Sequence, residues 1–547
     1  MRDIDRLTSE RYGIPSLVLM ENAASAVVRV IVSTLAGDVA AKTVVVLCGK
    51  GNNGGDGAAV GRLLAHAGAN VSVLLFGRIE EMKGDARTNF EALTSLATSS
   101  ESIPGSIRFV ECGTDDDAVR IVEEFFAQRA DVIVDGLFGT GLSRPLEGVY
   151  ARVVERINNA RARSADNLLT AAIDIPSGLN SDSANLIGPA VHADLTVTMT
   201  APKLANVLAP ASNYNGRLIV ADIGSPSELL AETKTDLFLS DETDAKRWLR
   251  ATRYTPDSYK NTHGHALIVA GSRGFIGAAA LCANAAMRAG AGLVTVATSV
   301  SAQSLVATQV MPEVMTTALA ETDRGAVSDD AIDYFSKFSE RADIIAIGPG
   351  LSSEDERTRA FVRKVVERRR TPIAIDADGL NCLSPWPEEL RGSSDLPIVL
   401  TPHPGEMLRL MGTTDKSSLE DRVAAAKRFA AQHSVILLLK GGRSLVASPD
   451  GRVFLNSTGN AGLGTAGAGD TLTGVVTGFL AQAQGCRTAN GSERVQVLDT
   501  VIAALYISGL AGDLAAHAFG MRAMVASDIR EHLSAAICSL DPRGEYP

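Results

Sequence analysis

Residues 456–484 read NSTGNAGLGTAGAGDTLTGVVTGFLAQAQ, and this stretch decides the fold expected for the C-terminal half of the chain. Five glycines lie between Gly459 and Gly469, and Asp470 then opens a run with apolar residues at helical spacing. Glycine-rich backbone that leads into a helix N-terminus gathers N–H groups and binds anions such as phosphate. The alternative is an ordinary glycine-rich turn in which Asp470 caps the helix.

Strand-like runs that end at glycine or polar loops precede this stretch. Because helical stretches separate them, they indicate a parallel, doubly wound α/β sheet. No GxxxxGK[ST] motif occurs, so a P-loop is excluded. His263 and His265 lack an evident third metal ligand. The expected strands cover residues 265–270, 293–297, 344–350, 373–378, 398–406 and 435–444.

Composition places the chain among ordinary globular proteins with two large domains, at 547 residues, 46% apolar and 21% charged. The formal net charge of −11 argues against nucleic acid or an anionic membrane as the main partner. Six scattered cysteines without a CxxC pair fit a reducing cytoplasm. No run approaches a membrane span, and the start lacks the apolar core of a signal peptide. We therefore expect a cytoplasmic protein, and a homo-oligomer.

The N-terminal half opens with a helix expected over residues 15–35 and then a βαβ unit. Its strand over 42–48 leads into GKGNNGGDG (49–57), a helical segment and a second strand over 70–77. Gly49, Gly51 and Gly54 satisfy the GxGxxG fingerprint of dinucleotide-binding domains. No acidic residue closes the second strand, so a plain Rossmann cofactor domain is not favoured.

Further strands are expected over 131–134, 169–174 and 195–199, and the first two run into polar loops. Such loops lie side by side at the carboxyl edge of a parallel sheet. Asn53, Asp135 and Ser177 would then converge as oxygen ligands, enough for a hard monovalent or divalent cation. The alternative is that the aspartates merely cap helices or turns.

LMENA (19–23), NNGGDG (52–57), DGLFGTGLSRP (135–145) and DIPSGL (174–179) resemble the motifs of the NAD(P)HX epimerases across most of residues 1–225. The resemblance implies a Rossmann-like three-layer domain that epimerises hydrated NADH or NADPH at the C6 hydroxyl carbon. It implies that Asp174 is the acid–base residue and that Asn53, Asp135 and Ser177 bind potassium. Ala24 departs from the glycine usual after ENA. The substrate residues implied are Asn52, Asn53, Gly54, Gly55, Asp56, Gly139, Thr140, Gly141, Leu142, Ser143, Arg144, Pro145, Tyr150 and Asp174.

GHALIVAGSRGFIGAA, GPGL, DADGL, TPHPGEM, LKGGRS and GAGDTLTG follow in this order and resemble the NAD(P)HX dehydratases, a ribokinase-like branch. The family reaction spends a nucleotide's phosphate on the ring hydroxyl and restores NAD(P)H, which makes Asp470 the catalytic base. The usual GGTGD reads AGAGD here, and anion-hole amides do not need the lost threonine side chain. The resemblance implies that Ala278, Gly350, His403 and Asp470 contact the hydrate, and that Lys440, Gly441, Gly442, Arg443, Ser444 and Gly469 bind the nucleotide.

The two resemblances together predict a bifunctional nicotinamide-hydrate repair enzyme, with an epimerase domain over 1–228 and a dehydratase domain over 229–547. The polar segment 223–253 reads as a surface connection between them. We expect NADHX and NADPHX as substrates, and ADP rather than ATP as the nucleotide, giving AMP and phosphate. Mg²⁺ should neutralise the phosphoryl oxygens. The alternative is a ribokinase-like kinase for a vitamin or sugar, fused to a non-catalytic Rossmann-like binding domain.

Overall fold

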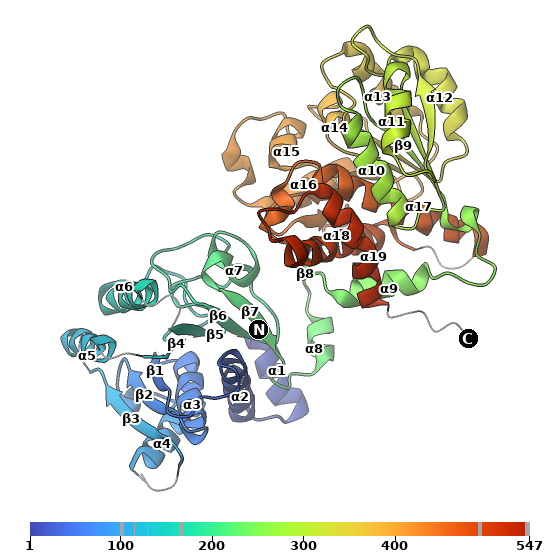
Figure 1. Ribbon diagram of the computed structural model, residues 1–547. Helices are drawn as coiled ribbons and strands as arrows, with labels where there is room; N and C mark the ends of the chain where they lie inside the picture. The colour runs from blue at the N-terminus through green and yellow to red at the C-terminus, as the bar shows by residue number, and fades with distance from the viewer. Residues whose placement is uncertain (99–102, 114, 128–129, 164–167, 491–494, 542–547) are drawn as a thin grey trace. The chain divides into compact units, whose positions relative to one another are not determined.

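The computed structural model describes residues 1–98, 103–113, 115–127, 130–163, 168–490 and 495–541. The chain forms two compact units, Met1–Lys234 and Thr235–Pro547. Each unit is an α/β structure with one sheet and helices packed on it, which confirms the predicted fold class (Figure 1). The expected domain boundary at residue 228 falls inside helix α8 (Ser227–Glu232), whose Glu232 forms an ion pair with Arg11 of the N-terminal unit.

The N-terminal unit has a seven-stranded parallel sheet in the order β3-β2-β1-β4-β5-β6-β7. Strand β1 (Thr43–Cys48), inside this sheet, is buried on both faces, because Val44 and Val46 belong to one apolar cluster, and Val45 and Leu47 to another. The β-branched run over 42–48 predicts this arrangement. The strands are β1 (Thr43–Cys48), β2 (Asn70–Leu75), β3 (Ser106–Glu111), β4 (Val132–Gly136), β5 (Leu169–Ile173), β6 (Leu195–Met199) and β7 (Arg217–Ala221).

Helices cover both faces of this sheet and make it a three-layer domain. Figure 1 shows α2 and α3 on one side of the strands and α5 and α6 on the other, and α4 packs in the same apolar cluster as α2 and α3. The N-terminal helices are α1 (Arg2–Tyr12), α2 (Ser16–Thr34), α3 (Asn52–His66), α4 (Gly84–Thr98), α5 (Asp115–Ala127), α6 (Gly148–Arg163) and α7 (Leu204–Val207).

The C-terminal unit has a ten-stranded sheet in the order β11-β10-β9-β12-β13-β14-β15-β16-β17-β8. The sheet is not parallel throughout as predicted, because β15, β16 and β17 pair in antiparallel fashion. Residues 440–444 are too few for a helical crossover and close a hairpin instead. The strands are β8 (Leu237–Leu239), β9 (His265–Val269), β10 (Leu293–Ser299), β11 (Met315–Leu319), β12 (Ile344–Ile347), β13 (Ile373–Ile375), β14 (Ile398–Leu400), β15 (Ile436–Leu439), β16 (Leu445–Ala447) and β17 (Val453–Leu455).

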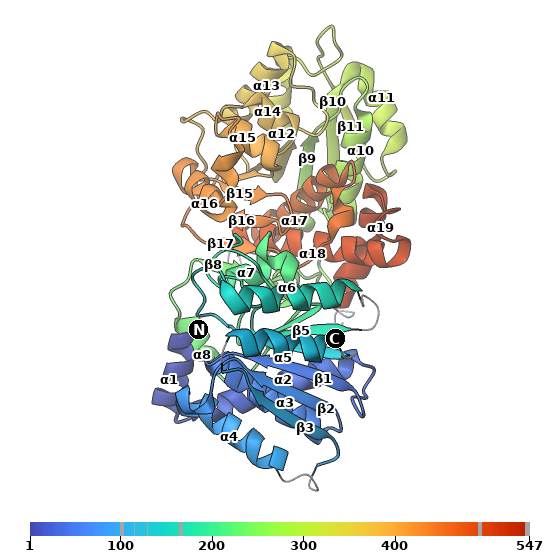
Figure 2. The ribbon, with the colours of Figure 1, turned by 90° about the vertical axis from the view of Figure 1, so that its left-hand side faces the viewer.

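The helices of this unit also lie on both sides of its sheet, with α12 to α16 on the side opposite α10 and α19 in Figure 2. They are α9 (Glu242–Ala251), α10 (Ile276–Arg288), α11 (Val300–Gln309), α12 (Ile332–Ser339), α13 (Glu356–Arg368), α14 (Asp378–Cys382), α15 (Pro404–Leu410), α16 (Arg422–His433), α17 (Ala468–Asn490), α18 (Val497–Phe519) and α19 (Ala526–Leu540).

The segment expected to be a surface connection contributes ordered elements to the C-terminal unit. Strand β8 pairs in parallel with β17 and closes that edge of the sheet. In α9, the indole of Trp248 stacks on Phe479 at 4.0 Å between ring centroids, and its Nε1 donates to Thr500 Oγ1. A three-residue strand is too short to show a period in the sequence, which is why this prediction was wrong.

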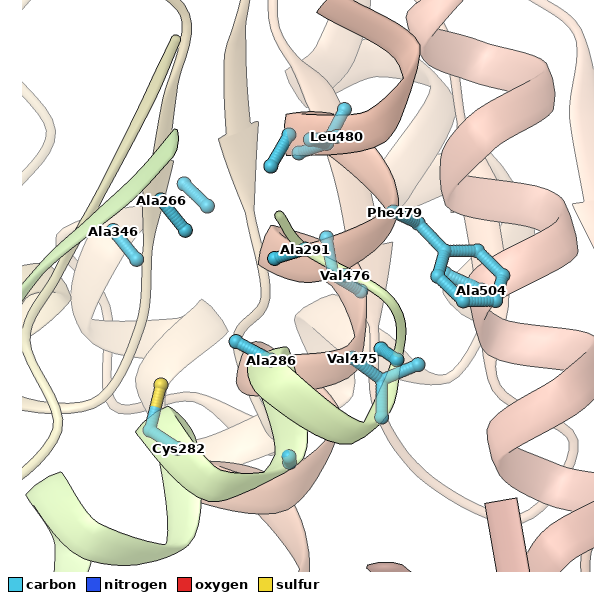
Figure 3. Packing of buried hydrophobic residues seen from close by; sticks show 14 of the residues in the cluster. Ala266, Cys282, Ala286, Ala291, Ala346, Val475, Val476, Phe479, Leu480 and Ala504 are labelled. Carbon is cyan, nitrogen blue, oxygen red and sulfur yellow. The ribbon is translucent and has the colours of Figure 1, made fainter. Parts of the chain in front are cut away.

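Small residues let α10 and α17 cross closely. A Cβ atom on Gly474 would lie 2.1 Å from the carbonyl oxygen of Cys282, and one on Gly478 would lie 2.6 Å from that of Ala286. Figure 3 shows this contact, with Phe479 pointing from α17 toward Ala504 of α18. The packing fixes the N-terminal end of α17, which begins at Ala468, so that Asp470 lies in the first turn of the helix.

Two helices, α2 and α18, are long and apolar enough to cross a membrane by length and composition, each with a mean hydropathy of 1.5. This corrects the expectation that no run approaches a span. In α18, 67% of the apolar window is buried inside the protein, and in α2 39%. Buried residues of α2 belong to the N-terminal core and those of α18 to the C-terminal core. Packing inside the C-terminal unit therefore accounts for most of the apolar surface of α18, whereas α2 packs only part of its apolar window into the N-terminal core.

Two candidate active sites

A cavity of about 1020 Å³ lies in the N-terminal unit, beside the carboxyl ends of the central strands β1, β4 and β5. Ligands of parallel α/β domains bind at this edge. Most residues expected to hold the substrate line it: Asn52, Asn53, Asp56, Gly139, Thr140, Gly141, Leu142, Arg144, Pro145, Tyr150 and Asp174.

The remaining expected substrate residues, Gly54, Gly55 and Ser143, do not line the cavity. Gly54 allows α3 to begin close to the strand before it, since a Cβ there would lie 1.8 Å from the carbonyl oxygen of Gly49. A Cβ on Gly55 would lie 2.7 Å from Cα of Ala86 in α4. Ser143 is exposed on the loop after β4. The two glycines thus shape the backbone around the cavity.

Asp135 and Ser177 meet in the interior of the N-terminal unit, at the ends of β4 and β5. The hydroxyl of Ser177 donates to Asp135 Oδ1 at 2.6 Å, and its backbone N–H donates to Oδ2 at 2.8 Å. Burial raises the pKa of Asp135 to about 6, although these hydrogen bonds oppose the rise. The third expected ligand, Asn53, contacts the loop after β4, because a Cβ on Gly139 would lie 3.3 Å from its Cγ.

Asp174 follows β5 and adopts a left-handed backbone conformation with φ of 65°. Its Oδ1 accepts three hydrogen bonds, from Lys203 Nζ at 2.5 Å, from Thr198 Oγ1 at 3.0 Å and from Met199 N at 3.1 Å. Among the described residues, none donates a hydrogen bond to its Oδ2. One oxygen of the carboxylate is therefore fixed, and the other is available in the cavity.

Lys203 lines the cavity, although it stands outside the motifs from which the site residues were predicted. Its side chain is 6% exposed, and its ammonium also donates to Thr198 Oγ1 at 2.9 Å and to the carbonyl oxygen of Met199 at 3.1 Å. Its only signal is its position a few residues beyond the carboxyl end of β6, at the ligand-binding edge of the sheet. Asp5 of α1 is a second unexpected lining residue.

In the C-terminal unit, Asp470 sits where the glycine stretch becomes helix α17. Gly467, with φ of 82°, makes the turn that a residue with a side chain would resist. Burial raises the pKa of Asp470 to about 6, the charge of Asp376 adds to the rise, and Lys440 opposes it. A carboxyl with this pKa is ionised at neutral pH and is still basic enough to accept a proton.

Lys440 stands between the glycine loop and a buried carboxylate. Its Nζ donates to Asp376 Oδ1 at 2.8 Å and lies 3.9 Å from Glu406 Oε2. A Cβ on Gly469 would be 3.3 Å from the same ammonium. Thr473 of α17 donates to the other oxygen of Asp376 at 2.6 Å. Burial lowers the pKa of Lys440, but the carboxylates of Asp376 and Glu406 outweigh this and raise it.

The expected nucleotide loop, residues 440–444, is held by the guanidinium of Arg422 in α16. Arg422 Nη1 donates to the carbonyl oxygen of Gly442 at 2.9 Å, and Nη2 to that of Lys440 at 3.2 Å. Within the loop, Gly441 N donates to Ser444 Oγ. Arg443 Nη1 donates to the carbonyl oxygen of Ser457 at 2.7 Å, which ties the loop to the glycine stretch.

The residues expected to contact the hydrate are partly brought together. Gly350 has φ of 63°, and a Cβ on it would lie 3.0 Å from Cβ of Ala278. His403 caps α15, where its Nδ1 accepts a hydrogen bond from Gly405 N at 3.0 Å. Burial and the charge of Lys440 lower the pKa of His403, so the ring is neutral. Its side chain is half exposed and keeps Nε2 near Glu406.

Asp376, Glu406 and Thr473 were not selected from the sequence, although each lies inside a motif already quoted (DADGL, TPHPGEM and GAGDTLTG). Their common feature is burial: Asp376 is 1% exposed, Glu406 5% and Thr473 1%. A charged or polar residue in a motif that follows a buried strand is the signal that could have found Asp376.

Comparison with known proteins covers both units. A family model described as NAD(P)H-hydrate dehydratase matches residues 266–535, and one described as YjeF-related protein N-terminus matches residues 16–205. The bifunctional NAD(P)H-hydrate repair enzyme of Moorella thermoacetica is 40% identical, with 100% of this chain and 97% of that protein covered. The enzyme of the same name from Escherichia coli is 32% identical, with 88% and 83% covered.

A solved structure is also similar to part of the chain. The ADP/ATP-dependent NAD(P)H-hydrate dehydratase of Bacillus subtilis, co-crystallised with ATP and Mg²⁺, is 28% identical with a TM-score of 0.47. The match covers 56% of this chain and 99% of the Bacillus chain.

Proposed function

Because the chain belongs to the family of bifunctional NAD(P)H-hydrate repair enzymes, we propose that its N-terminal unit interconverts the epimers of hydrated NADH and NADPH and that its C-terminal unit dehydrates one of them. The observation that carries this assignment is that relatives of this name align over the whole length of the chain, across both sites. The kinase alternative would leave a stable phosphorylated product instead of a restored nicotinamide.

In the N-terminal site, Asp174 exchanges protons with the substrate through Oδ2. Its Oδ1 accepts hydrogen bonds from Lys203, Thr198 and Met199, which leaves Oδ2 to face the substrate. The loop after β4 and the first turn of α3 enclose the substrate, with Asn52 and Tyr150 among the lining residues. The cavity is large enough to hold a nicotinamide ring with the sugar and phosphates attached to it.

Asn53, Asp135 and Ser177 suit a potassium ion in this unit. They supply carboxylate, hydroxyl and amide oxygens, the ligands of hard cations, and two of them are already in hydrogen-bond contact. The amide of Asn53 is buried, and its Nδ2 has no hydrogen-bond partner in the described part of the chain. A bound cation would supply positive charge beside the phosphates or polar groups of the substrate.

In the C-terminal site, Asp470 accepts the proton of the ring hydroxyl while the hydroxyl oxygen bonds to the phosphorus of the nucleotide's terminal phosphoryl group. The backbone amides of the glycine loop and the ammonium of Lys440 hold the charge on that group. Phosphate is then a good leaving group: the C6–O bond breaks, C5 gives up a proton, and the C5=C6 double bond of the reduced nicotinamide forms. ADP would give AMP and phosphate.

Mg²⁺ would come with the nucleotide. No group of three or more His, Cys, Asp or Glu side chains among the described residues could hold a metal ion by itself. Two buried acidic residues on the side of Lys440, Asp376 and Glu406, are engaged with its ammonium, and Asp513 accepts hydrogen bonds from Gly459 N and Asn460 Nδ2. Phosphate oxygens would therefore supply most of the ligands, as is usual for this ion, and the ion would neutralise phosphoryl charge.

We further propose a cytoplasmic homo-oligomer.

Hydrated NADH as a mixture of epimers, with ADP or ATP, tests both activities in the full-length protein. Wild type should restore the nicotinamide absorbance completely. Asp174→Ala should restore one epimer quickly and then slow to the rate of spontaneous epimerisation. Asp470→Asn should lose about 10²–10⁴-fold in dehydration, the usual contribution of a general base. Complete conversion by Asp174→Ala at one uniform rate would contradict the division of labour between the two units.

A further inference from the structure

Of the acidic residues that line the N-terminal cavity, three come from different parts of the fold: Asp5 from α1, Asp56 from α3, and Asp174 from the loop directly after β5. They differ in what surrounds them. Asp174 is paired with a buried ammonium. Within the described chain, Asp56 receives no hydrogen bond and no ion pair. Asp56 and Asp174 thus share one cavity but differ in the charges and donors beside them, which suits two carboxyl groups for different roles.

Asp56 is in surroundings that favour its neutral form. Burial raises its pKa well above the ordinary value, and the charges of Asp174 and Asp5 add to the rise. Burial likewise raises the pKa of Asp5, where the N-terminal ammonium of Met1 and then Lys203 oppose the rise and Asp174 adds to it. Lys203 is paired with Asp174, and all three of its N–H bonds are directed at Asp174, Thr198 and Met199. The ammonium of Lys203 therefore pairs with Asp174 and leaves Asp56 without a cationic partner among the described residues.

The chemistry of the substrate asks for one acid and one base. C6 of the hydrated ring carries the hydroxyl and is bonded to the ring nitrogen. If the hydroxyl takes a proton, it leaves as water, and the nitrogen lone pair forms a C6=N bond. A water molecule then adds to C6 from the other face, the electron pair returns to nitrogen, and the entering water gives up a proton. Each cycle breaks and makes one C6–O bond, and no oxidant or reductant is needed.

Resting on the proposed epimerase function, we propose that Asp56 is the acid that protonates the leaving hydroxyl and Asp174 the base that deprotonates the entering water, with Lys203 assigning the two roles. The proton from Asp56 ends on the departing water, and the proton of the entering water ends on Asp174 Oδ2. Water in the cavity returns the proton from Asp174 to Asp56. The reverse conversion runs the same steps backwards.

The cationic ring formed midway fits the charge of the cavity. The residues that line it include Asp5, Asp56, Asp85, Asp174 and Glu147, against the cations Lys50, Arg144 and Lys203. Lys50 is paired with Glu81, so its charge is compensated. The carboxylate of Asp174 can serve as a counter-ion for the positive ring, in addition to being the base.

Labelling in H₂¹⁸O distinguishes loss and re-addition of water from an alternative mechanism, in which the C6–N bond opens and closes again. With nucleotide omitted, only epimerisation runs in the full-length wild type, starting from one epimer separated by chromatography. In H₂¹⁸O, loss and re-addition of water place a solvent oxygen on C6 in each conversion, so the product epimer should carry the heavy oxygen. Ring opening at the C6–N bond would keep the original oxygen, and a product without the label would overturn the proposal. This arm does not depend on any variant folding.

Variants of Asp56 test which residue is the acid. Asp56→Asn keeps the shape and should lower kcat of epimerisation by about 10²–10⁴-fold with KM within about threefold. Asp56→Glu should recover part of kcat because it restores a carboxylic acid. Asp3→Asn, on α1 with its side chain 87% exposed, is the matched control and should epimerise like wild type. A raised KM with unchanged kcat in Asp56→Asn would make Asp56 a binding residue only and overturn the assignment.

The experiments distinguish failure of the epimerase function from failure of the roles proposed for Asp56 and Asp174. If wild type did not interconvert the epimers at all, the epimerase function itself would be wrong. If wild type interconverts them but the label or the Asp56 variants disagree, only the roles of Asp56 and Asp174 fall. Dehydration of the accepted epimer by Asp56→Asn, with nucleotide added, shows that the variant chain is otherwise active.

Discussion

Replacing the buried Asp376 by asparagine tests whether its charge sets the proton affinity of Asp470. Asp470 must be ionised to act as a base, and its pKa of about 6 places the loss of dehydration below about pH 6. The negative charge of Asp376 contributes to that raised value, after burial. Asp376→Asn removes the charge and keeps the shape, so the pKa of Asp470 should fall and the acid limb should move to lower pH.

The expected displacement is modest because burial is the larger cause and remains in the variant. We expect the midpoint to fall by about half a pH unit, which corresponds to about 0.7 kcal/mol of repulsion between the two carboxylates. At about pH 5, wild type should keep about a tenth of its maximal rate and the variant about a quarter of its own maximum.

Asp376→Asn should also lower the free energy of unfolding. Asp376→Asn leaves the ammonium of Lys440 with Glu406 at 3.9 Å as its nearest remaining carboxylate. Removing one partner of a buried pair costs about 3–5 kcal/mol, and the amide oxygen of asparagine can still accept a hydrogen bond from Lys440. A loss of about 2–3 kcal/mol in the free energy of unfolding is therefore expected.

The assay is the pH dependence of kcat/KM for dehydration of the accepted epimer, together with urea unfolding. Thr473→Val is the matched control, because it removes the hydrogen bond to Asp376 Oδ2 and retains the charge. Its acid limb should coincide with that of wild type, and its unfolding free energy should drop by about 1 kcal/mol. An acid limb in Asp376→Asn at the wild-type position or higher would refute the electrostatic reasoning.

Asp135→Ala should abolish most epimerisation and any response of the remaining rate to the exchange of potassium for a bulky organic cation. Dehydration should continue, since Asp135 contacts Ser177 within the N-terminal unit. A variant whose epimerisation still responds to potassium would disprove the cation site. Arg422→Met should raise KM for the nucleotide about tenfold with little change in kcat, because Arg422 holds the carbonyl groups of Gly442 and Lys440 without belonging to the glycine loop at Asp470. Steady-state dehydration kinetics measure this split, and an unchanged KM would show that the loop keeps its shape without Arg422.

The architecture could be predicted where the sequence carries a strong local pattern. β1 is a continuous β-branched run and α17 follows a glycine stretch, and both appear with ends close to those expected. The short strands were harder. β8 has three residues between polar segments, and β16 and β17 have three each, so pairing with neighbours rather than local periodicity creates them.

In the candidate sites, too, residues in strong local motifs could be predicted, and residues brought in only by folding could not. Asp174 and Asp470 stand in motifs whose glycines and prolines mark special backbone, and the motifs place them beside a strand end and a helix start. Lys203 stands in a polar loop with no such mark, and only folding brings its ammonium to Asp174. Asp5 lies on a helix that the sequence reading left unassigned. Residues that act on another residue's charge leave little trace in sequence.

Strand β8 gives the connecting segment a consequence for dissecting the protein. It is the last strand on its side of the C-terminal sheet, and β17 pairs with it along three residues. A dehydratase fragment begun at residue 241 would leave the backbone groups of β17 without partners, and bare sheet edges join with those of other molecules. A fragment begun at residue 229 would keep this strand. The solubility of the isolated C-terminal unit thus depends on residues 229–240, which in the sequence resemble a linker that could be removed.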